Sequence, residues 1–161
     1  SWFMEIGRRH SPAVKKLGML LFGKFIHPHE HVQVNSATWY ASALLPISLF
    51  FGPVPCVLGV LALGFGDPLA ATVGRRWGRV RLRAARSLEG TLTFAGVTFA
   101  AGLALLLVAH PELSAGARVL LAAVAAVTGA LTELFSGRID DNFSIPVAVA
   151  GSTALTLALL A

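Results

Sequence analysis

The sharpest cluster of chemically useful side chains is Asp140-Asp141-Asn142, two adjacent carboxylates followed by a carboxamide. Mg²⁺ prefers such oxygen ligands, and proteins commonly hold it with one or two carboxylates together with substrate phosphates. Glu133 lies near the end of the preceding apolar segment, from which it can approach the same position. A structural alternative is a solvated cap before a helix that begins at Phe143, with Asn142 as the N-cap. We favour the metal interpretation because Glu133 supplies a further carboxylate.

An arginine-rich segment is the second candidate, because a guanidinium group presents a planar fork of donors that matches phosphate. Within twelve residues it contains Arg75, Arg76, Arg79, Arg81, Arg83 and Arg86. Acidic lipid headgroups are one suitable partner for this segment, and a nucleoside triphosphate is another. Anchoring of the membrane topology is the alternative role, but six arginines exceed what anchoring requires. The P-loop pattern G-x-x-x-x-G-K-[ST] is absent, which excludes a soluble-type nucleotide-binding fold.

The elements that must carry these residues are membrane-spanning helices. Of the 161 residues, 55% are hydrophobic and 13% are charged, whereas a soluble domain is about 45–50% apolar and about 25% charged. A helix needs roughly 20 mostly apolar residues to cross a bilayer. Apolar segments occur at 37–51, 54–73, 90–109, 116–135 and 143–161, and Pro46 interrupts the first of them. We therefore expect an all-α, polytopic transmembrane helix bundle with about five transmembrane helices.

Residues 1–36 differ from the rest because basic residues are interleaved there with aromatic residues and leucine. The pattern is typical of a basic amphipathic helix at the membrane interface, and a cytoplasmic segment without a lipid role fits equally well. We expect one integral membrane domain, 1–161. Its interfacial or cytoplasmic segment is 1–36 and its transmembrane catalytic core is 37–161.

Asp67 is an ionisable residue inside the second apolar segment. At membrane depth such a group costs about 2.5–3.5 kcal/mol on insertion scales, so a functional role is expected. The run from Gly64 to Pro68 also predicts a break in the helix, with Asp67 as N-cap and Pro68 at the first position of the next helix. The two interpretations are compatible, because a helix start at membrane depth is itself a site for an anion or a substrate.

The distribution of positive charge predicts the topology. Basic loops stay in the cytoplasm, so an N-terminus inside and five crossings place both 74–89 and 136–142 inside. The turn at 52–53 and the loop at 110–114 then lie outside. Two polar loops that are distant in the sequence would open on one side and could form one site. We expect a multi-pass protein of the cell (inner) membrane with its active site on the cytoplasmic face.

Three motifs resemble those of the CTP-dependent lipid kinase family, which includes dolichol, phytol and yeast-type diacylglycerol kinases and is related to the phosphatidate cytidylyltransferases. Residues 66–78 (GDPLAATVGRRWG) resemble D-x-x-A-A-x-x-G-R-x-x-G, and residues 86–91 (RSLEGT) resemble K-S-x-x-G-S. Residues 140–146 (DDNFSIP) resemble D-D-N-[FL]-[ST]-[IV]-P. A weaker match, with Glu30 followed by NSATWY at 35–40, precedes them in the same order. The family's upstream Arg-Lys-x-x-His motif is missing, and Arg86 stands where lysine is common.

The resemblance implies transfer of the γ-phosphate of CTP to the hydroxyl of a membrane lipid alcohol, with Mg²⁺ as cofactor. The lipid would be of the diacylglycerol, polyprenol or phytol type. The resemblance and the arginine segment together indicate a nucleotide site made by Asp67, Gly74, Arg75, Arg76, Gly78, Arg86, Ser87, Glu89, Gly90 and Asn142. The metal ligands would be Asp140, Asp141 and Asp67. The carboxylates that could orient or deprotonate the lipid hydroxyl are Asp140, Asp141 and Glu133.

Two other functions are alternatives to the lipid kinase. A phosphatidate cytidylyltransferase has a similar K-T-x-E-G motif, but its C-terminal motif contains a His-Gly-Gly core that 136–142 lacks. A small transporter or membrane scaffold, in which the acidic groups only cap helices, is the other alternative. The expected partners are CTP, the lipid substrate and the bilayer, with no nucleic acid, and a homo-oligomer is compatible with the sequence.

Overall fold

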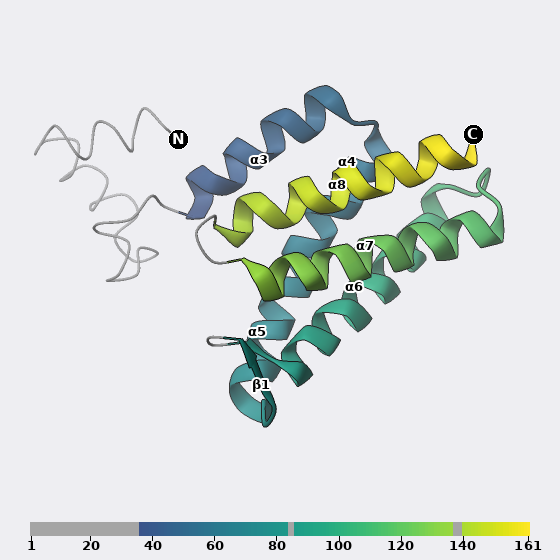
Figure 1. Ribbon diagram of the computed structural model, residues 1–161. Coiled ribbons are helices and arrows are strands. Elements are labelled where there is room, and N and C mark those ends of the chain that lie inside the picture. The colour runs from purple at the N-terminus through teal and green to yellow at the C-terminus, as the bar shows by residue number, and fades with distance from the viewer. Residues whose placement is uncertain (1–35, 84–85, 137–139) are drawn as a thin grey trace, which may run out of the picture.

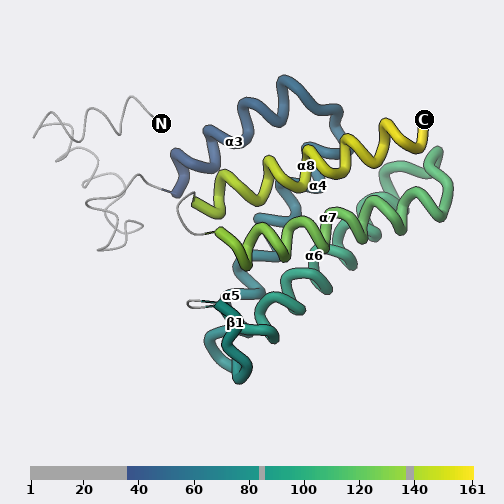
Figure 2. The backbone as a smooth tube through the Cα atoms, viewed as in Figure 1, coloured from purple at the N-terminus to yellow at the C-terminus, as the bar shows by residue number. Residues whose placement is uncertain are grey.

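The computed structural model describes residues 36–83, 86–136 and 140–161 (Figures 1 and 2). The elements in chain order are α3 (Ser36–Phe50), α4 (Pro53–Leu61), the π-helix η2 (Ala62–Gly66), α5 (Asp67–Trp77), β1 (Arg81–Arg83), β2 (Arg86–Ser87), α6 (Leu88–Ala109), α7 (Ala115–Phe135) and α8 (Asp141–Leu160). The interfacial helix expected within 1–36 falls, except for its last position, outside the described residues. So does the match that begins at Glu30, apart from its final SATWY run.

The predicted all-α membrane bundle is confirmed. Four helical segments of the described chain are long and apolar enough to cross a membrane: Pro53–Trp77, Leu88–Ala109, Ala115–Phe135 and Asp141–Leu160. The remaining helix, α3, has 15 residues and rises only about 22 Å, which is less than the roughly 30 Å of a bilayer core. The prediction of about five crossings therefore becomes four candidate spans and one shorter helix.

The candidate span Pro53–Trp77 shows that the predicted helix break at 64–68 is wrong. The chain runs on from α4 to α5 through η2, and Asp67 has helical backbone angles of φ −62° and ψ −52°. Pro68 lacks an N–H, and its ring would clash with the carbonyl of Gly64 in a regular α-helix. A single π-helical turn adjusts the backbone at this point without ending the helix. Asp67 is therefore not an N-cap but a side chain in the middle of a span.

Pro46 does not interrupt α3 either, because the helix continues through it to Phe50. Proline is tolerated inside membrane helices when neighbouring groups compensate for the lost backbone hydrogen bond. α3 packs along α8 and also contacts α4. The thiol of Cys56 on α4 donates a hydrogen bond to the carbonyl of Ile47, the residue directly after the proline.

The core lies where small residues let the helices approach closely. α6 packs against α7, and α7 packs against α8 (Figure 1). The fully buried ring of Phe94 fills the space between η2 and α7, where a Cβ on Gly66 or Gly129 would lie 3.0 Å or 2.6 Å from it. Small residues at helix contacts are the usual basis of packing in membrane proteins. This contact holds the π-helical turn, and therefore Asp67, against the centre of the bundle.

A short antiparallel hairpin, which the sequence analysis did not predict, joins α5 to α6. Arg81 pairs with Ser87 and Arg83 pairs with Arg86. The backbone N–H of Leu88 also donates to the carbonyl of Val80 at 2.9 Å. The hairpin orders the second half of the arginine-rich segment and carries Arg86 toward the ends of α7 and α8.

Candidate functional site

Arg86 joins the two polar loops that the charge pattern predicted on one side. Its Nη1 lies 2.6 Å from Oε1 of Glu133 at the end of α7, and its Nη2 lies 2.9 Å from Oδ2 of Asp141 at the start of α8. Figure 1 shows the hairpin at the same end of the bundle as these two helix ends. The predicted meeting of the loops is confirmed, and a single arginine makes the connection.

The start of α8 fixes the orientation of the acidic cluster. Asp140 is the N-cap, and its Oδ1 accepts from the backbone N–H of Asn142 at 3.0 Å and from its Nδ2 at 2.7 Å. Asn142 also donates to Oδ1 of Asp141 at 3.3 Å. The alternative with Asn142 as N-cap is therefore wrong by two residues. The cap leaves Oδ2 of Asp140 outside these bonds, so capping does not use all of its acceptor capacity.

Among the described residues, only one of the two carboxylate oxygens of Glu133 has a partner. The residue is 3% exposed, and its Oε1 pairs with Arg86 while its Oε2 has no hydrogen-bond partner among the described residues. A buried acceptor without a partner costs about 1–3 kcal/mol, and more when it is charged. This carboxylate oxygen therefore suits a cation or a hydroxyl group as its partner. Such a partner is expected at a site for magnesium and phosphate.

Asp67 faces the same cluster from α5. It is half-buried, and the charges of Asp141, Arg86 and Asp140 act on it, as does that of Arg75. Among the described residues its carboxylate accepts no hydrogen bond. The described part of the chain holds no group of three or more acidic, histidine or cysteine side chains around a single point. The set Asp67, Asp140 and Asp141 therefore stays a prediction, and two carboxylates with phosphate oxygens would be enough for Mg²⁺.

The glycines and the serine of the predicted nucleotide site form a close-packed junction. Ser87 is buried and caps α6, accepting from the backbone N–H of Gly90 at 3.2 Å. A Cβ on Gly74 would lie 3.1 Å from the Ser87 hydroxyl, and one on Gly90 would lie 3.0 Å from the carbonyl of Ala70. These residues thus place the N-terminus of α6 directly against α5, whatever else they bind. A helix N-terminus presents free backbone N–H groups and partial positive charge, which suits a phosphate group.

The remaining predicted residues separate into two groups. Glu89 lies close to the backbone N–H of Val80, at 3.3 Å and 3.4 Å from its two oxygens, and so braces the hairpin. Arg75 and Arg76 are exposed, and the guanidinium of Arg76 stacks 5.1 Å from the centre of the Trp77 ring. Arg76 is therefore not drawn into the cluster around Arg86, whereas Arg75 interacts electrostatically with Asp67.

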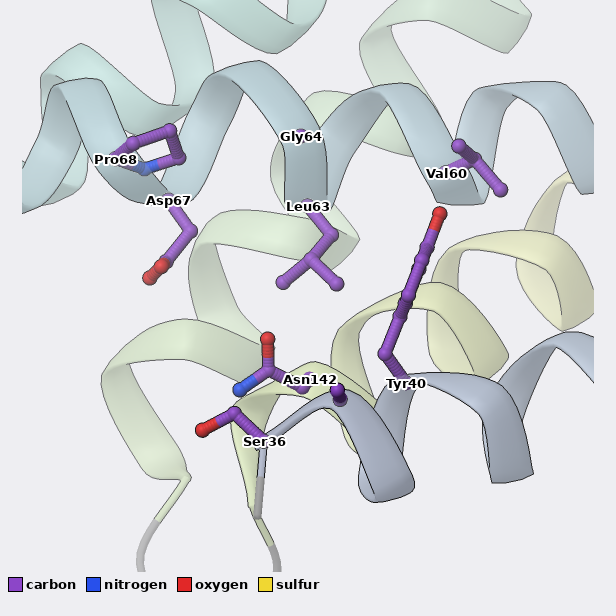
Figure 3. A pocket seen from close by; sticks show the side chains of 9 residues that line it. Ser36, Tyr40, Val60, Leu63, Gly64, Asp67, Pro68 and Asn142 are labelled. Atoms are coloured by element: carbon purple, nitrogen blue, oxygen red, sulfur yellow. The ribbon is translucent and has the colours of Figure 1, made fainter. Parts of the chain in front are cut away.

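A pocket of about 410 Å³ adjoins this cluster, with Asp67 and Asn142 in its wall. Figure 3 shows Asp67 directed from α5 toward the side where Asn142 and Ser36 lie, while the ring of Tyr40 points toward Val60. The pocket is lined by Ser36, Ala37, Tyr40, Val60, Leu63, Gly64, Asp67, Pro68 and Asn142. Sequence reasoning missed most of these residues, because three separate segments contribute them. The only available signal was the SATWY run, which supplies Ser36, Ala37 and Tyr40.

Two curated relatives share sequence with this chain. A phytol kinase of Synechocystis sp. is 36% identical over 101 residues, which covers 59% of this chain and 41% of that enzyme. A dolichol kinase of Saccharomyces cerevisiae is 44% identical over 50 residues, which covers 30% of this chain and 10% of that enzyme. The chain thus spans less than half the length of either relative. No protein-family model matches it, and no solved structure does so. The resemblance to lipid kinases that the motifs indicated is confirmed.

Proposed function

We propose that this relative of phytol kinase and dolichol kinase is a multi-pass membrane enzyme that transfers the γ-phosphate of CTP to the hydroxyl of a membrane lipid alcohol. The observation that carries the proposal is the bridge from Arg86 to Glu133 and Asp141. It places a guanidinium group, which is suited to bind phosphate, and two carboxylates at one end of the bundle, next to the N-terminus of α6. Phosphoryl transfer requires little more of a protein than positioning and charge stabilisation around the phosphates.

In the proposed reaction the lipid hydroxyl oxygen forms a bond to the γ-phosphorus of CTP. The bond from that phosphorus to the bridging oxygen breaks, and CDP leaves with the electron pair. The hydroxyl proton passes to a carboxylate, for which Asp140, Asp141 and Glu133 are the candidates. Bound Mg²⁺ would neutralise charge on the phosphates, and Asp140, Asp141 and Asp67 are the side chains that would hold it. Arg75 and Arg86 would contact phosphate oxygens, while the junction of Gly74, Gly78, Ser87 and Gly90 would hold the backbone against them.

The relatives also bear on the substrate and on the alternatives. Both are named as kinases and neither as a cytidylyltransferase, which supports phosphate transfer over synthesis of a CDP-lipid. Phytol and dolichol are both long isoprenoid alcohols, so an alcohol of that type is the acceptor we favour over diacylglycerol. The density of arginine in 75–86 supports a site on the cytoplasmic face.

The donor can be identified with the purified full chain in lipid vesicles that contain an isoprenoid alcohol. Each of the four γ-labelled nucleoside triphosphates is supplied in turn, with Mg²⁺ or with EDTA. We expect labelled lipid with CTP and Mg²⁺, and little label with the other three donors or with EDTA. Equal labelling from ATP, or labelling that persists in EDTA, would overturn the donor or the metal part of the proposal.

Two substitutions of Asp140 separate its role as a helix cap from its proposed role at the metal. Asparagine caps a helix as well as aspartate does, whereas alanine loses about 1 kcal/mol of stability. We expect Asp140→Asn to keep the wild-type melting temperature and still lose at least about 100-fold in kcat, because metal-assisted charge stabilisation is worth several kcal/mol and each 1.36 kcal/mol is tenfold. Asp140→Ala should lower the melting temperature as well as kcat. If Asp140→Asn retained full activity, the residue would be a cap and nothing more.

A further inference from the structure

The pocket between α3, α5 and α8 has one apolar end and one polar end. Leu63, Val60 and the ring of Tyr40 make its apolar wall, and the carboxylate of Asp67 and the carboxamide of Asn142 lie at its polar end (Figure 3). Small-molecule sites typically combine a mainly apolar lining with a few polar groups that fix orientation, and they occupy about 300–1,000 Å³. At about 410 Å³, the pocket is large enough for the head of a lipid and the first part of its chain.

The polar end of the pocket is also the edge of the charged cluster. Asn142 hydrogen-bonds both Asp140 and Asp141, and Asp141 in turn pairs with Arg86. Asp67 interacts electrostatically with the same groups. A hydroxyl held between Asp67 and Asn142 would therefore lie beside the groups proposed to hold the phosphates. Asp67 is the described carboxylate that lines this pocket, and Asp140 and Asp141, two of the candidates for the base, adjoin it through the hydrogen bonds that Asn142 donates to them.

The pocket is open at the surface of the bundle. Ala37, Gly64 and Pro68 line it and are exposed at the surface of the bundle. Gly64 and Pro68 lie in the first of the four candidate spans, Pro53–Trp77. A Cβ added to Gly64 would meet nothing within 4 Å, so the space beside this glycine is open. A ligand can therefore reach the pocket from the surface, between α3 and the segment from Gly64 to Pro68.

We propose that this pocket is the acceptor site, in which the lipid alcohol places its hydroxyl between Asp67 and Asn142 and its chain along Leu63, Val60 and Tyr40 toward the bilayer. The inference rests on the proposed kinase function and specifies where its second substrate binds. The occupant is an alcohol at the end of a long apolar chain, because the carboxylate of Asp67 and the carboxamide of Asn142 lie at one end of the pocket, while the hydroxyl of Tyr40 is the polar group near Val60 (Figure 3). The nucleotide would bind on the other side of Asp67, against the N-terminus of α6.

The test changes a residue that lines the pocket and that is not among the residues proposed to bind the nucleotide. Gly64→Leu adds a large side chain at an open position that lines the pocket, and Gly64→Ala adds a smaller one. Gly96→Leu is the matched control, because Gly96 is exposed on α6 and its added Cβ also meets nothing within 4 Å. The KM for the lipid alcohol and the KM for CTP are measured separately, on the full chain in vesicles that contain the isoprenoid alcohol.

We expect Gly64→Leu to raise the KM for the alcohol by about 10-fold or more, since even one methylene in an apolar pocket is worth about 10–200-fold in discrimination. The KM for CTP should stay within about twofold, Gly64→Ala should give a smaller effect, and Gly96→Leu should behave as wild type. If Gly64→Leu does not fold, Val60→Trp replaces it, with Val127→Trp as control because Val127 is exposed on α7.

The outcomes distinguish this inference from the proposed function. If the wild type transfers no phosphate to lipid from CTP, the proposed function is wrong. If the wild type is active and filling the pocket leaves the KM for the alcohol unchanged, the acceptor site is wrong while the kinase stands. An equal rise in the KM for CTP would also overturn the acceptor site, because the pocket would then serve the nucleotide.

Discussion

Arg86→Ala is expected to abolish phosphate transfer and to destabilise the whole bundle. The substitution leaves Glu133 buried with neither oxygen paired, and it frees the start of α8 from the hairpin. Removing one partner of a buried ion pair costs about 3–5 kcal/mol, and the lower end of that range applies because the Arg86 side chain is 26% exposed. We expect kcat/KM to fall by at least about 100-fold, together with a clear drop in melting temperature measured in detergent.

Three variants separate the causes of that loss. Arg86→Lys keeps the charge and places the residue that is common at this position in the resembled family, so it should retain substantial activity. Adding Glu133→Gln to Arg86→Ala should recover part of the stability, because no buried charge is then left unpaired, but it should recover no activity. Arg118→Ala is the control at the opposite end of the bundle, where Arg118 donates to the carbonyls of His110 and Pro111. Wild-type activity in Arg86→Ala would contradict the proposed site.

Gly78→Val is expected to have the second-largest effect, because it disrupts the junction between α5 and α6. A Cβ at this position would lie 2.6 Å from the hydroxyl oxygen of Ser87 and 2.8 Å from its Cβ, and it would also press on the carbonyl of Gly74. Overpacking of this kind costs about 1–3 kcal/mol. The N-terminus of α6 and the hairpin must then move away from α5, so CTP binding should weaken by at least about tenfold.

The measurement is binding of CTP to the purified variant by equilibrium dialysis, with the melting temperature recorded in parallel. Gly116→Val is the control, because a Cβ on Gly116 meets nothing within 4 Å and this residue lies at the far end of α7. Normal CTP affinity in a folded Gly78→Val variant would show that the junction does not position the nucleotide.

The helices were largely predictable, because apolar length and loop charge are local properties of a membrane sequence. Each predicted apolar segment overlaps an observed helix, and α7 differs from its predicted start by one residue. The charge pattern also predicted correctly that the arginine-rich segment and the end of α7 meet. Two spans, α6 and α7, separate the arginine-rich segment from 136–142, so both segments lie on the same side of the membrane. This holds whether or not the short helix α3 crosses.

Local backbone features were harder to predict. A glycine pair followed by proline indicates a helix break as readily as a π-helical turn, and the choice depends on how Phe94 packs against Gly66. The N-cap at Asp140 rather than Asn142 likewise depends on where α8 meets Arg86. The motifs indicate nucleotide contacts at the glycines 74, 78 and 90, and the structure adds that these glycines bring two helices together around Ser87. The pocket was not predictable, since its polar and apolar walls come from segments that are distant in the chain.

The central claim is tested most directly with CTP that carries one label on the γ-phosphate and a different label in the cytosine base. The full chain is incubated with this nucleotide, Mg²⁺ and vesicles that contain an isoprenoid alcohol, and the lipid is then extracted and counted for both labels. We predict lipid that carries the phosphate label without the base label, and one CDP released for each lipid phosphorylated. Lipid that carries the base label would show cytidylyl transfer instead, and lipid with neither label would contradict an enzymatic role in phosphate transfer.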